Sequence, residues 1–422
     1  MILRKNRSSF FQLFSTCAGN LFEHYDTALF GFLSTFLAPV IFPSKDPTTA
    51  LLLTYVMIPI GMLARPVGAL FFGYLGDSFG RNIALFWSLL GMGIISFFIG
   101  VFPAQISIGF LPPLFICLAR MMQNFCAAGE TIGGAIYLLE SSSKDQHDFL
   151  SGVYGASTIG GIIMASIATS LLVYFDVVMQ GWRYLYFVGV VTAVFGLLIR
   201  KDKMKNSSIK LPSRLNLKQH IQVLLSYKKT LAIIALVSGF SYVTYSISII
   251  FLNGCIPLIS SISSSSMITL SSFLLILDFI LLPLFGLLSS KFSRIKLMVF
   301  SSIITVLVAV PSFFFLQGAT AGTVVVIRII LMSLGAMFSA PLHAFVQGLV
   351  PKEHRYSVIS FGYSLGSQLL GGPSAAISLW LFKKTGQIYL AGLYWVLLAF
   401  ICSVVLIRLY RSEKKISFAH AV

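Results

Sequence analysis

Long apolar stretches joined by short polar connections run through all 422 residues of the chain. A helix rises about 1.5 Å per residue, so about 20 apolar residues cross the ~30 Å hydrocarbon core of a bilayer. Twelve stretches approach or exceed that length, six in each half. They cover residues 11–36, 51–75, 83–101, 113–139, 150–174, 184–199, 230–252, 268–288, 297–316, 323–350, 359–382 and 388–409. The pattern predicts an all-α protein that crosses a membrane twelve times.

One connecting loop occurs twice, 213 positions apart. The two copies are Gly73-Tyr-Leu-Gly-Asp77-Ser-Phe-Gly80-Arg81 and Gly286-Leu-Leu-Ser-Ser290-Lys-Phe-Ser293-Arg294. The second half of the chain therefore looks like a diverged duplicate of the first. Duplicated sets of apolar helices are typical of secondary transporters, which bind substrate between the two sets. We expect two pseudo-symmetric bundles of six helices each.

A polar and basic stretch separates the two halves. We expect an N-terminal six-helix bundle at 1–200, a cytoplasmic basic linker at 201–229, and a C-terminal six-helix bundle with a short cytoplasmic tail at 230–422. Within the linker, residues 215–225 suggest a helix that lies on the membrane surface. No segment is large enough for a nucleotide-binding domain, and neither loop copy carries the Gly-Lys-Ser/Thr of a P-loop. The energy for transport must then come from a gradient.

Composition supports a membrane as the solvent of this chain. Charged residues make up 10% of it and hydrophobic residues 57%, whereas a soluble domain is roughly 25% charged. The net charge of +17 comes from basic residues gathered at both ends, in the linker and in alternate connections. This asymmetry follows the positive-inside rule and places both termini in the cytoplasm. The charge therefore indicates topology, and we expect no nucleic acid as a partner.

The cysteine and histidine residues give no sign of a metal, a cofactor or an enzyme. Five cysteines are scattered through the apolar stretches, and six histidines never fall at metal-ligand spacing. A membrane-embedded enzyme would need a nucleophile and base, or a metal, near a membrane face. We find no such constellation, so the sequence predicts that this chain is not an enzyme.

Several further motifs resemble the major facilitator superfamily. The first loop copy is similar to that family's signature between helices 2 and 3. The runs Gly19-Asn-Leu-Phe-Glu23-His-Tyr25-Asp26, Arg65-Pro66-Val-Gly68, Gly129-Glu130-Thr-Ile-Gly133-Gly134, Gly181-Trp182-Arg183 and Pro351-Lys-Glu-His-Arg355-Tyr resemble its metabolite:proton symporters. That branch includes proline/betaine permeases and α-ketoglutarate, citrate and shikimate permeases. One departure is Asn124, which stands where a glycine commonly follows the Arg-x-x-Gln of helix 4.

Two carboxylates in the first predicted helix are candidates for proton coupling. Glu23 and Asp26 lie three residues apart and so share one helix face. An ionisable side chain inside a span costs about 2.5–3.5 kcal/mol on insertion scales, so it needs a reason to be there. Two nearby carboxylates favour protonation of one of them near neutral pH. The alternative is that both only accept hydrogen bonds or pair with arginines.

Arg120 and Glu130 are the matching candidates in the fourth predicted helix. Arginine stays charged, so Arg120 needs an anion, and the resemblance implies an acid of helix 1, for which we choose Asp26. Glu130 lies about 15 Å further along the helix axis and forms a separate site, for protons or substrate. Its alternative role is a packing hydrogen bond. Arg328, 208 residues after Arg120, is either its echo in the second half or an arginine that reaches toward the membrane surface.

The expected substrate-binding residues combine these charges with aromatic side chains. Arg65 would steer an anion, or else pair with an acid, and aromatic faces attract quaternary ammonium groups. The candidates are Tyr25, Arg65, Arg120, Gln123, Glu130, Tyr242 and Tyr245. We expect Asp278 and His343 to be structural.

A second set of residues is expected to act as a gating latch. Asp77 can interact with the positive end of a neighbouring helix, and Arg81 can pair with Glu140 at the end of helix 4. The resemblance implies that this set, Gly73, Asp77, Gly80, Arg81 and Glu140, holds the two halves in an outward-open state. In the second copy Ser290 replaces the aspartate, so we expect the latch to be one-sided.

The sequence thus predicts a multi-pass protein of the plasma membrane, the inner membrane of a bacterium. Its function would be proton-driven symport of a small carboxylate-bearing metabolite, first a proline- or betaine-type osmolyte. The alternatives are a di- or tricarboxylate of the α-ketoglutarate or citrate kind, and export of drugs or metabolites. The expected partners are the substrate, H⁺ and the lipid bilayer, and the expected state is a monomer without cofactors or metals.

Overall fold

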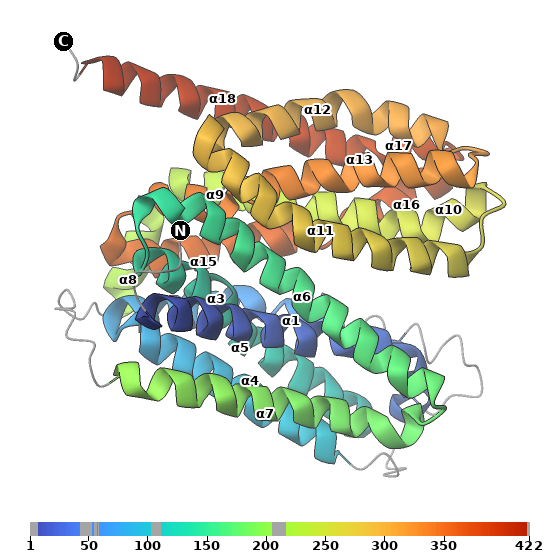
Figure 1. Cartoon of the computed structure of the whole chain (residues 1–422), viewed down its shortest axis with the longest axis horizontal. Coiled ribbons are helices and arrows are strands. Elements are labelled where there is room, and N and C mark those ends of the chain that lie inside the picture. The colour runs from blue at the N-terminus through green and yellow to red at the C-terminus, as the bar shows by residue number, and fades with distance from the viewer. Residues whose placement is uncertain are drawn as a thin grey trace. The chain divides into compact units, whose positions relative to one another are not determined.

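The computed structural model describes residues 7–42, 53–54, 57, 59–102, 111–204 and 217–419, and these residues form helices and short connections (Figure 1). In the first half the helices are α1 (Arg7–Ile41), α3 (Arg65–Ser78), α4 (Arg81–Val101), α5 (Leu111–Glu140), α6 (His147–Tyr174) and α7 (Val178–Met204). Helix α8 (Leu217–Ser226) lies within the predicted linker. The rest are α9 (Lys228–Tyr245), α10 (Leu252–Ile259), α11 (Ser264–Phe292), α12 (Arg294–Phe315), α13 (Ala321–Ser339), α14 (Leu342–Gly348), α15 (Arg355–Leu365), α16 (Ser374–Thr385), α17 (Ile388–Ala391) and α18 (Leu393–Ala419).

The all-α membrane fold predicted from the sequence is confirmed. Each of the twelve predicted spans contains helical structure among its described residues, with short turns at a few positions. Within the described residues, seven helical segments are long and apolar enough to cross a membrane by their own composition. Large apolar side chains such as Trp87 and Leu307, 53% and 62% exposed, cover the outside of these helices. Lipid rather than water is the solvent that suits them.

Breaks in the later spans have local causes. The predicted span 323–350 divides into α13 and α14 at Pro341, and 359–382 divides before α16 at Pro373. Proline has no backbone N–H to donate within a helix. Two wide π-helical turns, η2 (Ser246–Phe251) and η4 (Gly366–Gly371), interrupt the helices that follow α9 and α15. Such turns disturb the regular hydrogen-bond ladder and are often found at functional positions.

The chain packs as two compact units that follow the two halves, apart from two short segments. The first unit contains 1–142, 157–227 and 350–364, and the second contains 143–156, 228–349 and 365–422. Each half therefore contributes one segment to the other unit: the start of α6 in one case and nearly all of α15 in the other. The division at 1–200, 201–229 and 230–422 is a division of the sequence and stays a prediction.

Close helix contacts in the first unit depend on small residues. Helix α4 lies beside α7 and α5 (Figure 1). Helix α6 meets α1 at Gly161, where an added Cβ would come within 2.1 Å of the Leu21 carbonyl oxygen. The side-chain amide of Asn20 donates to Ser157 (2.8 Å) and Thr158 (2.9 Å) at the same contact. The core of the unit contains Leu29, Leu33, Trp182 and Tyr186, among others.

The second unit is built on α12, which lies beside α18 and α13 (Figure 1). Several of its polar side chains form hydrogen bonds to neighbouring helices. The indole of Trp395 donates to Thr244 Oγ1 at 3.0 Å, and the Tyr394 hydroxyl donates to the Leu370 carbonyl oxygen in η4 at 2.8 Å. Ser241 and Ser339 share a hydrogen bond of 2.6 Å between α9 and α13. These side-chain bonds stabilise the helices around the two π-turns.

The linker helix α8 packs against the first unit. Leu224 and His220 are buried, whereas Ile221 and Leu225 are 49% and 65% exposed. The His220 ring meets the Tyr74 ring edge-on at 5.3 Å, and its Nε2 has no hydrogen-bond partner among the described residues. Burial lowers the pKa of His220, although the charge of Asp77 acts in the opposite direction. The predicted helix at 215–225 is thus present, one side buried and one exposed.

A substitution at the α1–α6 contact tests how tightly these helices pack. We expect Gly161→Ala to lower the free energy of unfolding by about 1–3 kcal/mol, because the added methyl group meets backbone atoms that cannot move aside. The matched control is Gly31→Ala in α1, where a Cβ meets nothing within 4 Å. Thermal unfolding in detergent measures both. Equal melting temperatures for the two variants would contradict this packing.

The buried imidazole makes docking of α8 sensitive to acid. Because the pKa of docked His220 lies below its ordinary value of about 6.5, docking is at full strength above that pH. As the pH falls below about 6.5, protons bind mainly to the undocked form and docking weakens. Hydrogen–deuterium exchange of 217–226 at neutral and acidic pH, corrected for intrinsic rates, measures this. His220→Gln should abolish the change, and unchanged protection of the native helix in acid would refute the effect.

Candidate functional site

A hydrogen-bond network around Asp26 joins α1, α4 and α5. Asp26 is 3% exposed and accepts hydrogen bonds from the Ser96 hydroxyl and from Gln123 Nε2, the latter at 3.1 Å. Gln123 Nε2 also lies 3.0 Å from Ser96 Oγ, and Gln123 Oε1 accepts from Arg120 Nη1 at 2.9 Å. The Gln123 amide therefore stands between the acid and the arginine. We call Asp26, Ser96, Arg120 and Gln123 the Asp26 network.

Arg120 reaches Asp26 only through this amide. Its other contacts are a 3.3 Å hydrogen bond to the Thr27 carbonyl oxygen and the ring of Phe30, whose centroid lies 4.8 Å from the guanidinium carbon. The sequence predicts Asp26 as the partner of Arg120. Among the described residues no ion pair joins the two side chains, and the connection through Gln123 replaces it.

Three buried polar atoms near this network lack hydrogen-bond partners among the described residues. They are Asp26 Oδ1, Arg120 Nε and the hydroxyl oxygen of Tyr186 on α7. Tyr186 is fully buried and lies within electrostatic range of both Asp26 and Arg120. An unsatisfied carboxylate oxygen in such a place favours a proton or another hydrogen-bond donor. The arrangement is chemically suited to taking up and releasing a proton.

Glu23 belongs to a second network, one helical turn away. Its two carboxylate oxygens lie 2.8 and 2.7 Å from the Thr131 hydroxyl of α5, and Arg65 Nη2 lies 3.4 Å from Oε1. His24 Nδ1 is 3.8 Å from the other oxygen. Glu23 and Asp26 thus share a helix face but have different partners. Arg65 thus lies within ion-pair distance of an acid, Glu23.

Asn124 links Arg65 to this second network. Its Oδ1 accepts from Arg65 Nε at 2.9 Å, and its Nδ2 donates to the Arg120 carbonyl oxygen at 2.9 Å. The asparagine that departs from the family pattern therefore has a clear local role: it orients Arg65 toward Glu23.

The remaining candidates have separate surroundings. Tyr25 is buried and donates to the Leu185 carbonyl oxygen at 3.0 Å, which ties α1 to α7. Glu130 is completely buried in α5, directly before Thr131. Tyr242 and Tyr245 belong to α9 in the second unit, where Tyr242 packs against Gly371 and Tyr245 lies within electrostatic range of Asp278. The first unit thus contains both networks, and the two tyrosines are outside it.

Asp77 and Arg81 form a cluster with the start of α15. The Asp77 carboxylate accepts from the backbone N–H groups of Tyr356 (3.2 Å) and Ser357 (2.9 Å), and from the Ser357 hydroxyl (2.5 Å). Arg81 Nη1 lies 2.5 Å from Asp77 Oδ1. A carboxylate on the first N–H groups of a helix is favoured by the helix dipole. We call these residues, with Glu140 and Arg355, the Asp77 cluster.

Glu140 at the end of α5 forms ion pairs with two arginines of this cluster. Arg81 Nε is 3.5 Å from one oxygen and Arg355 Nη1 is 3.0 Å from the other. Arg81 Nη2 also donates to the Lys352 carbonyl oxygen at 2.6 Å. The predicted pairing of Arg81 with Glu140 is present in this geometry, and Arg355 is an unexpected third member.

Two glycines allow α15 to come this close. An added Cβ at Gly73 would meet Ser357 Cα at 2.7 Å, and one at Gly133 would lie 1.9 Å from the Tyr356 hydroxyl oxygen. That hydroxyl donates to the Gly129 carbonyl oxygen at 2.5 Å. Gly80 has φ +112°, a value that favours glycine, and it precedes Arg81 at the start of α4.

The second loop copy repeats this arrangement inside the second unit. Gly286 approaches Phe149 of α6 as Gly73 approaches Ser357 of α15, and Ser293 adopts φ +78° where the first copy has Gly80. Arg294 Nε lies 3.0 Å from Asp148 Oδ1. The acid missing at Ser290 is therefore supplied by α6. The one-sided latch stays a prediction, and the second copy has this ion pair of its own.

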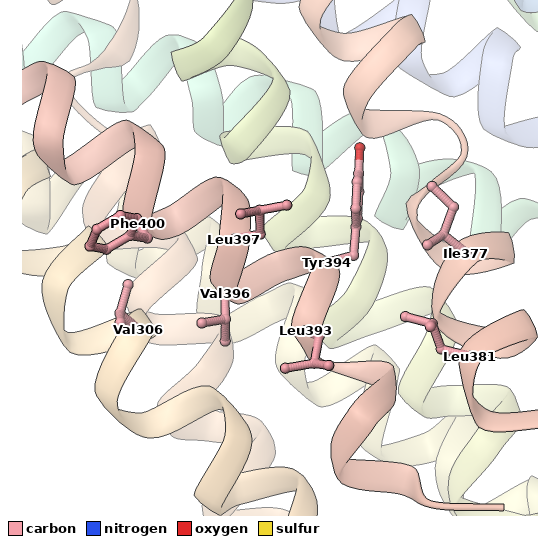
Figure 2. A pocket seen from close by; sticks show the side chains of 8 residues that line it. All are labelled: Val306, Ile377, Leu381, Leu393, Tyr394, Val396, Leu397 and Phe400. Atoms are coloured by element: carbon pink, nitrogen blue, oxygen red, sulfur yellow. The ribbon is translucent and has the colours of Figure 1, made fainter. Parts of the chain in front are cut away.

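An apolar cavity lies within the second unit. It has a volume of about 530 Å³ and lies between α12, α16 and α18 (Figure 2). Val306, Leu381, Leu393 and Phe400 are among its lining residues, and the hydroxyl end of Tyr394 points away from them. A lining without polar groups suits a lipid-facing groove rather than a site for a charged metabolite.

Comparison with known families and proteins gives a consistent result. The sequence model of the Major Facilitator Superfamily matches residues 27–254, more than half of the chain. The glycine betaine/proline/ectoine/pipecolic acid transporter of Dickeya dadantii is 25% identical over 408 residues, covering 91% of this chain and 79% of its own. The proline/betaine transporter of Salmonella typhimurium is 24% identical over 408 residues, covering 91% and 80%.

Solved structures agree on the fold. A double-tryptophan variant of XylE is similar with a TM-score of 0.77 at 13% identity, over 94% of this chain and 95% of that one. A bacterial homologue of the iron transporter ferroportin, in an outward-facing state, is similar with a TM-score of 0.70 at 15% identity, over 96% and 99%. At these identities the likeness concerns the fold alone. The chain is a multi-pass membrane transporter rather than an enzyme, and it belongs to the Major Facilitator Superfamily.

Proposed function

We propose that this transporter carries a small zwitterionic metabolite of the proline or betaine type together with a proton, by alternating access. The Asp26 network is the observation that carries the proposal, because it places a buried carboxylate with an unsatisfied oxygen beside a buried arginine. Two relatives that match about nine-tenths of the chain are named as transporters of proline and betaine.

In the proposed mechanism Asp26 holds the proton. When Asp26 is ionised, the Gln123 amide connects its charge to Arg120, and the two charges balance. Protonation of Asp26 removes the negative charge and leaves Arg120 in need of another anion. The negative charge of the substrate's carboxylate restores the charge balance that the bound proton has altered. Proton and substrate are then favoured together, which is the requirement for symport.

The further roles complete this proposal. Glu23 and Glu130 serve as additional proton or substrate groups, with Tyr25, Arg65, Gln123, Tyr242 and Tyr245 as substrate contacts. The Asp77 cluster acts as the latch. The bundles divide at the linker, both termini face the cytoplasm of a bacterial inner membrane, and the protein works as a monomer without nucleic acid.

Uptake into proteoliposomes tests the proposed function. Labelled proline, glycine betaine, α-ketoglutarate and citrate are compared with and without an inward proton gradient. One pH unit supplies about 1.4 kcal/mol per proton, enough for about tenfold accumulation at one-to-one stoichiometry. We expect proline or betaine to accumulate and the gradient to drive it. If only α-ketoglutarate or citrate accumulates, the substrate is a di- or tricarboxylate and the proposed zwitterion is wrong. If the proton gradient does not change uptake, proton symport is wrong.

The proton role of Asp26 is tested by Asp26→Asn, which fixes the side chain in an uncharged form. We expect gradient-driven accumulation to be lost while exchange of labelled for unlabelled substrate continues, because exchange needs no net proton transfer. The matched control is Asp176→Asn, at an exposed position with φ +54°. Accumulation by Asp26→Asn at the native level would contradict the assignment.

The latch role is tested by Asp77→Asn. The change removes the charge that receives Arg81 and the N–H groups of α15, and each charged hydrogen bond contributes about 1.5–3 kcal/mol. We expect about a tenfold or greater loss of turnover with substrate affinity little changed. Ser290→Asn, at the same place in the second copy, is the control and should transport normally. Native turnover together with native affinity in Asp77→Asn would remove the latch.

A further inference from the structure

Arg328 is a buried cation that the proposed mechanism does not use. It lies on α13 in the second unit, and its side chain is 0% exposed. Sequence reasoning left open an arginine that reaches toward the membrane surface, but complete burial does not fit such a position. A guanidinium stays charged in proteins, so this charge must be balanced from within the membrane-spanning part.

Among the described residues, the hydrogen-bond partners of Arg328 are neutral groups. Arg328 Nη2 donates to Ser271 Oγ at 3.0 Å and to the carbonyl oxygens of Ser248 and Ile249 at 3.3 and 3.4 Å. Its Nη1 lies 3.8 Å from the sulfur of Met267. Its Nε has no hydrogen-bond partner among the described residues. Most of these contacts are long, and none brings a negative charge.

The sequence leaves little choice of an internal counter-ion. Between positions 228 and 409 the acidic residues are Asp278 and Glu353. The segment 143–156 of the second unit adds Asp145, which is exposed, and Asp148, which pairs with Arg294. Glu353 belongs to the first unit. Asp278 follows Ser271 on α11 by seven residues, about 10 Å along the helix axis, and within the described part of the chain no ion pair joins it to Arg328. An uncompensated buried charge is unfavourable, so an anion from outside the chain would stabilise the buried guanidinium of Arg328.

The π-turn η2 adds backbone carbonyl oxygens to the surroundings of Arg328. Its residues Ser248 and Ile249 present backbone carbonyl oxygens to the guanidinium. If a carboxylate takes the two-pronged donor face of Arg328, those carbonyl oxygens are released and can face a positive group. Guanidinium, hydroxyl and carbonyl oxygens are then complementary to a molecule with a carboxylate at one end and a cationic nitrogen at the other.

We propose that Arg328 is the carboxylate anchor of a zwitterionic substrate, with Ser271 as an additional donor and the Ser248 and Ile249 carbonyl oxygens facing its cationic nitrogen. This inference rests on the proposed function and assigns the substrate's carboxylate to the second unit. Arg120 is less available for that task, because its Nη1 is bound to Gln123 and its guanidinium lies over the Phe30 ring.

Isothermal titration of the full chain in nanodiscs tests the anchor. The probes are glycine betaine and L-proline, with choline as the quaternary ammonium compound that lacks a carboxylate, and α-ketoglutarate and citrate as carboxylates without a cationic nitrogen. We expect Arg328→Gln to lower the affinity for betaine or proline by about 10- to 100-fold, because a charged hydrogen-bond pair is lost. Weak choline binding should not change, so the preference for betaine over choline disappears.

Two further variants separate recognition from folding. Arg328→Lys keeps the charge without the two-pronged donor face, and we expect intermediate affinity with a native melting temperature. Arg408→Gln on α18, an exposed position in the same unit, is the control and should bind as the native protein does. If Arg328→Gln fails to fold, the affinity of Arg328→Lys for betaine or proline is compared with that of the native protein. Equal affinities would overturn the role of Arg328 as carboxylate anchor.

The outcomes also separate this inference from the proposed function. Unchanged binding of betaine or proline by a folded Arg328→Gln overturns the anchor and leaves the substrate class intact. If the native protein binds α-ketoglutarate or citrate instead, and Arg328→Gln loses them, Arg328 still anchors a carboxylate but the zwitterionic substrate is wrong. If the native protein binds none of the four carboxylates, both are wrong.

Discussion

A charged side chain inside a membrane helix has no water to solvate it, so its partners must come from neighbouring helices. This constraint organises the first unit. Asp26 and Arg120 are too costly to bury alone, and the Gln123 amide, the Ser96 hydroxyl and the Thr27 carbonyl oxygen satisfy them between α1, α4 and α5. A change in the charge of Asp26 would therefore alter the hydrogen bonds that join α1, α4 and α5.

The duplicated loops show how the same contact survives a change of residues. In each copy a glycine allows a neighbouring helix start to approach, and an arginine one residue after a positive φ reaches an acid. The first copy carries its own acid at Asp77. The second copy has lost that acid, and Asp148 of α6 replaces it. The geometry of approach has been kept more closely than the identity of the charged residues.

The fold could be predicted well because length and hydrophobicity alone determine membrane-spanning helices, and the repeated loop gave the two halves. The breaks at η2 and η4 could not be predicted, because a π-turn depends on tertiary hydrogen bonds. One such bond joins the Tyr394 hydroxyl to the Leu370 carbonyl oxygen. Among site residues, the sequence drew attention to the ionisable ones, which are rare in apolar helices. Ser96, Thr131 and Tyr186 were missed, since hydroxyl side chains are common there and only helix rotation decides which face an acid. The pairing of Arg65 with Glu23 and that of Arg294 with Asp148 could not be predicted either, because both depend on how the helices are rotated.

The central claim is that substrate and proton enter together through a chemistry centred on Asp26. Its most direct test needs no imposed pH gradient. Proteoliposomes containing the native protein and an internal pH indicator are given an inward gradient of glycine betaine or proline, with the membrane potential clamped. The account predicts that the interior becomes more acidic as substrate enters. Entry of the same substrate at constant internal pH would contradict it.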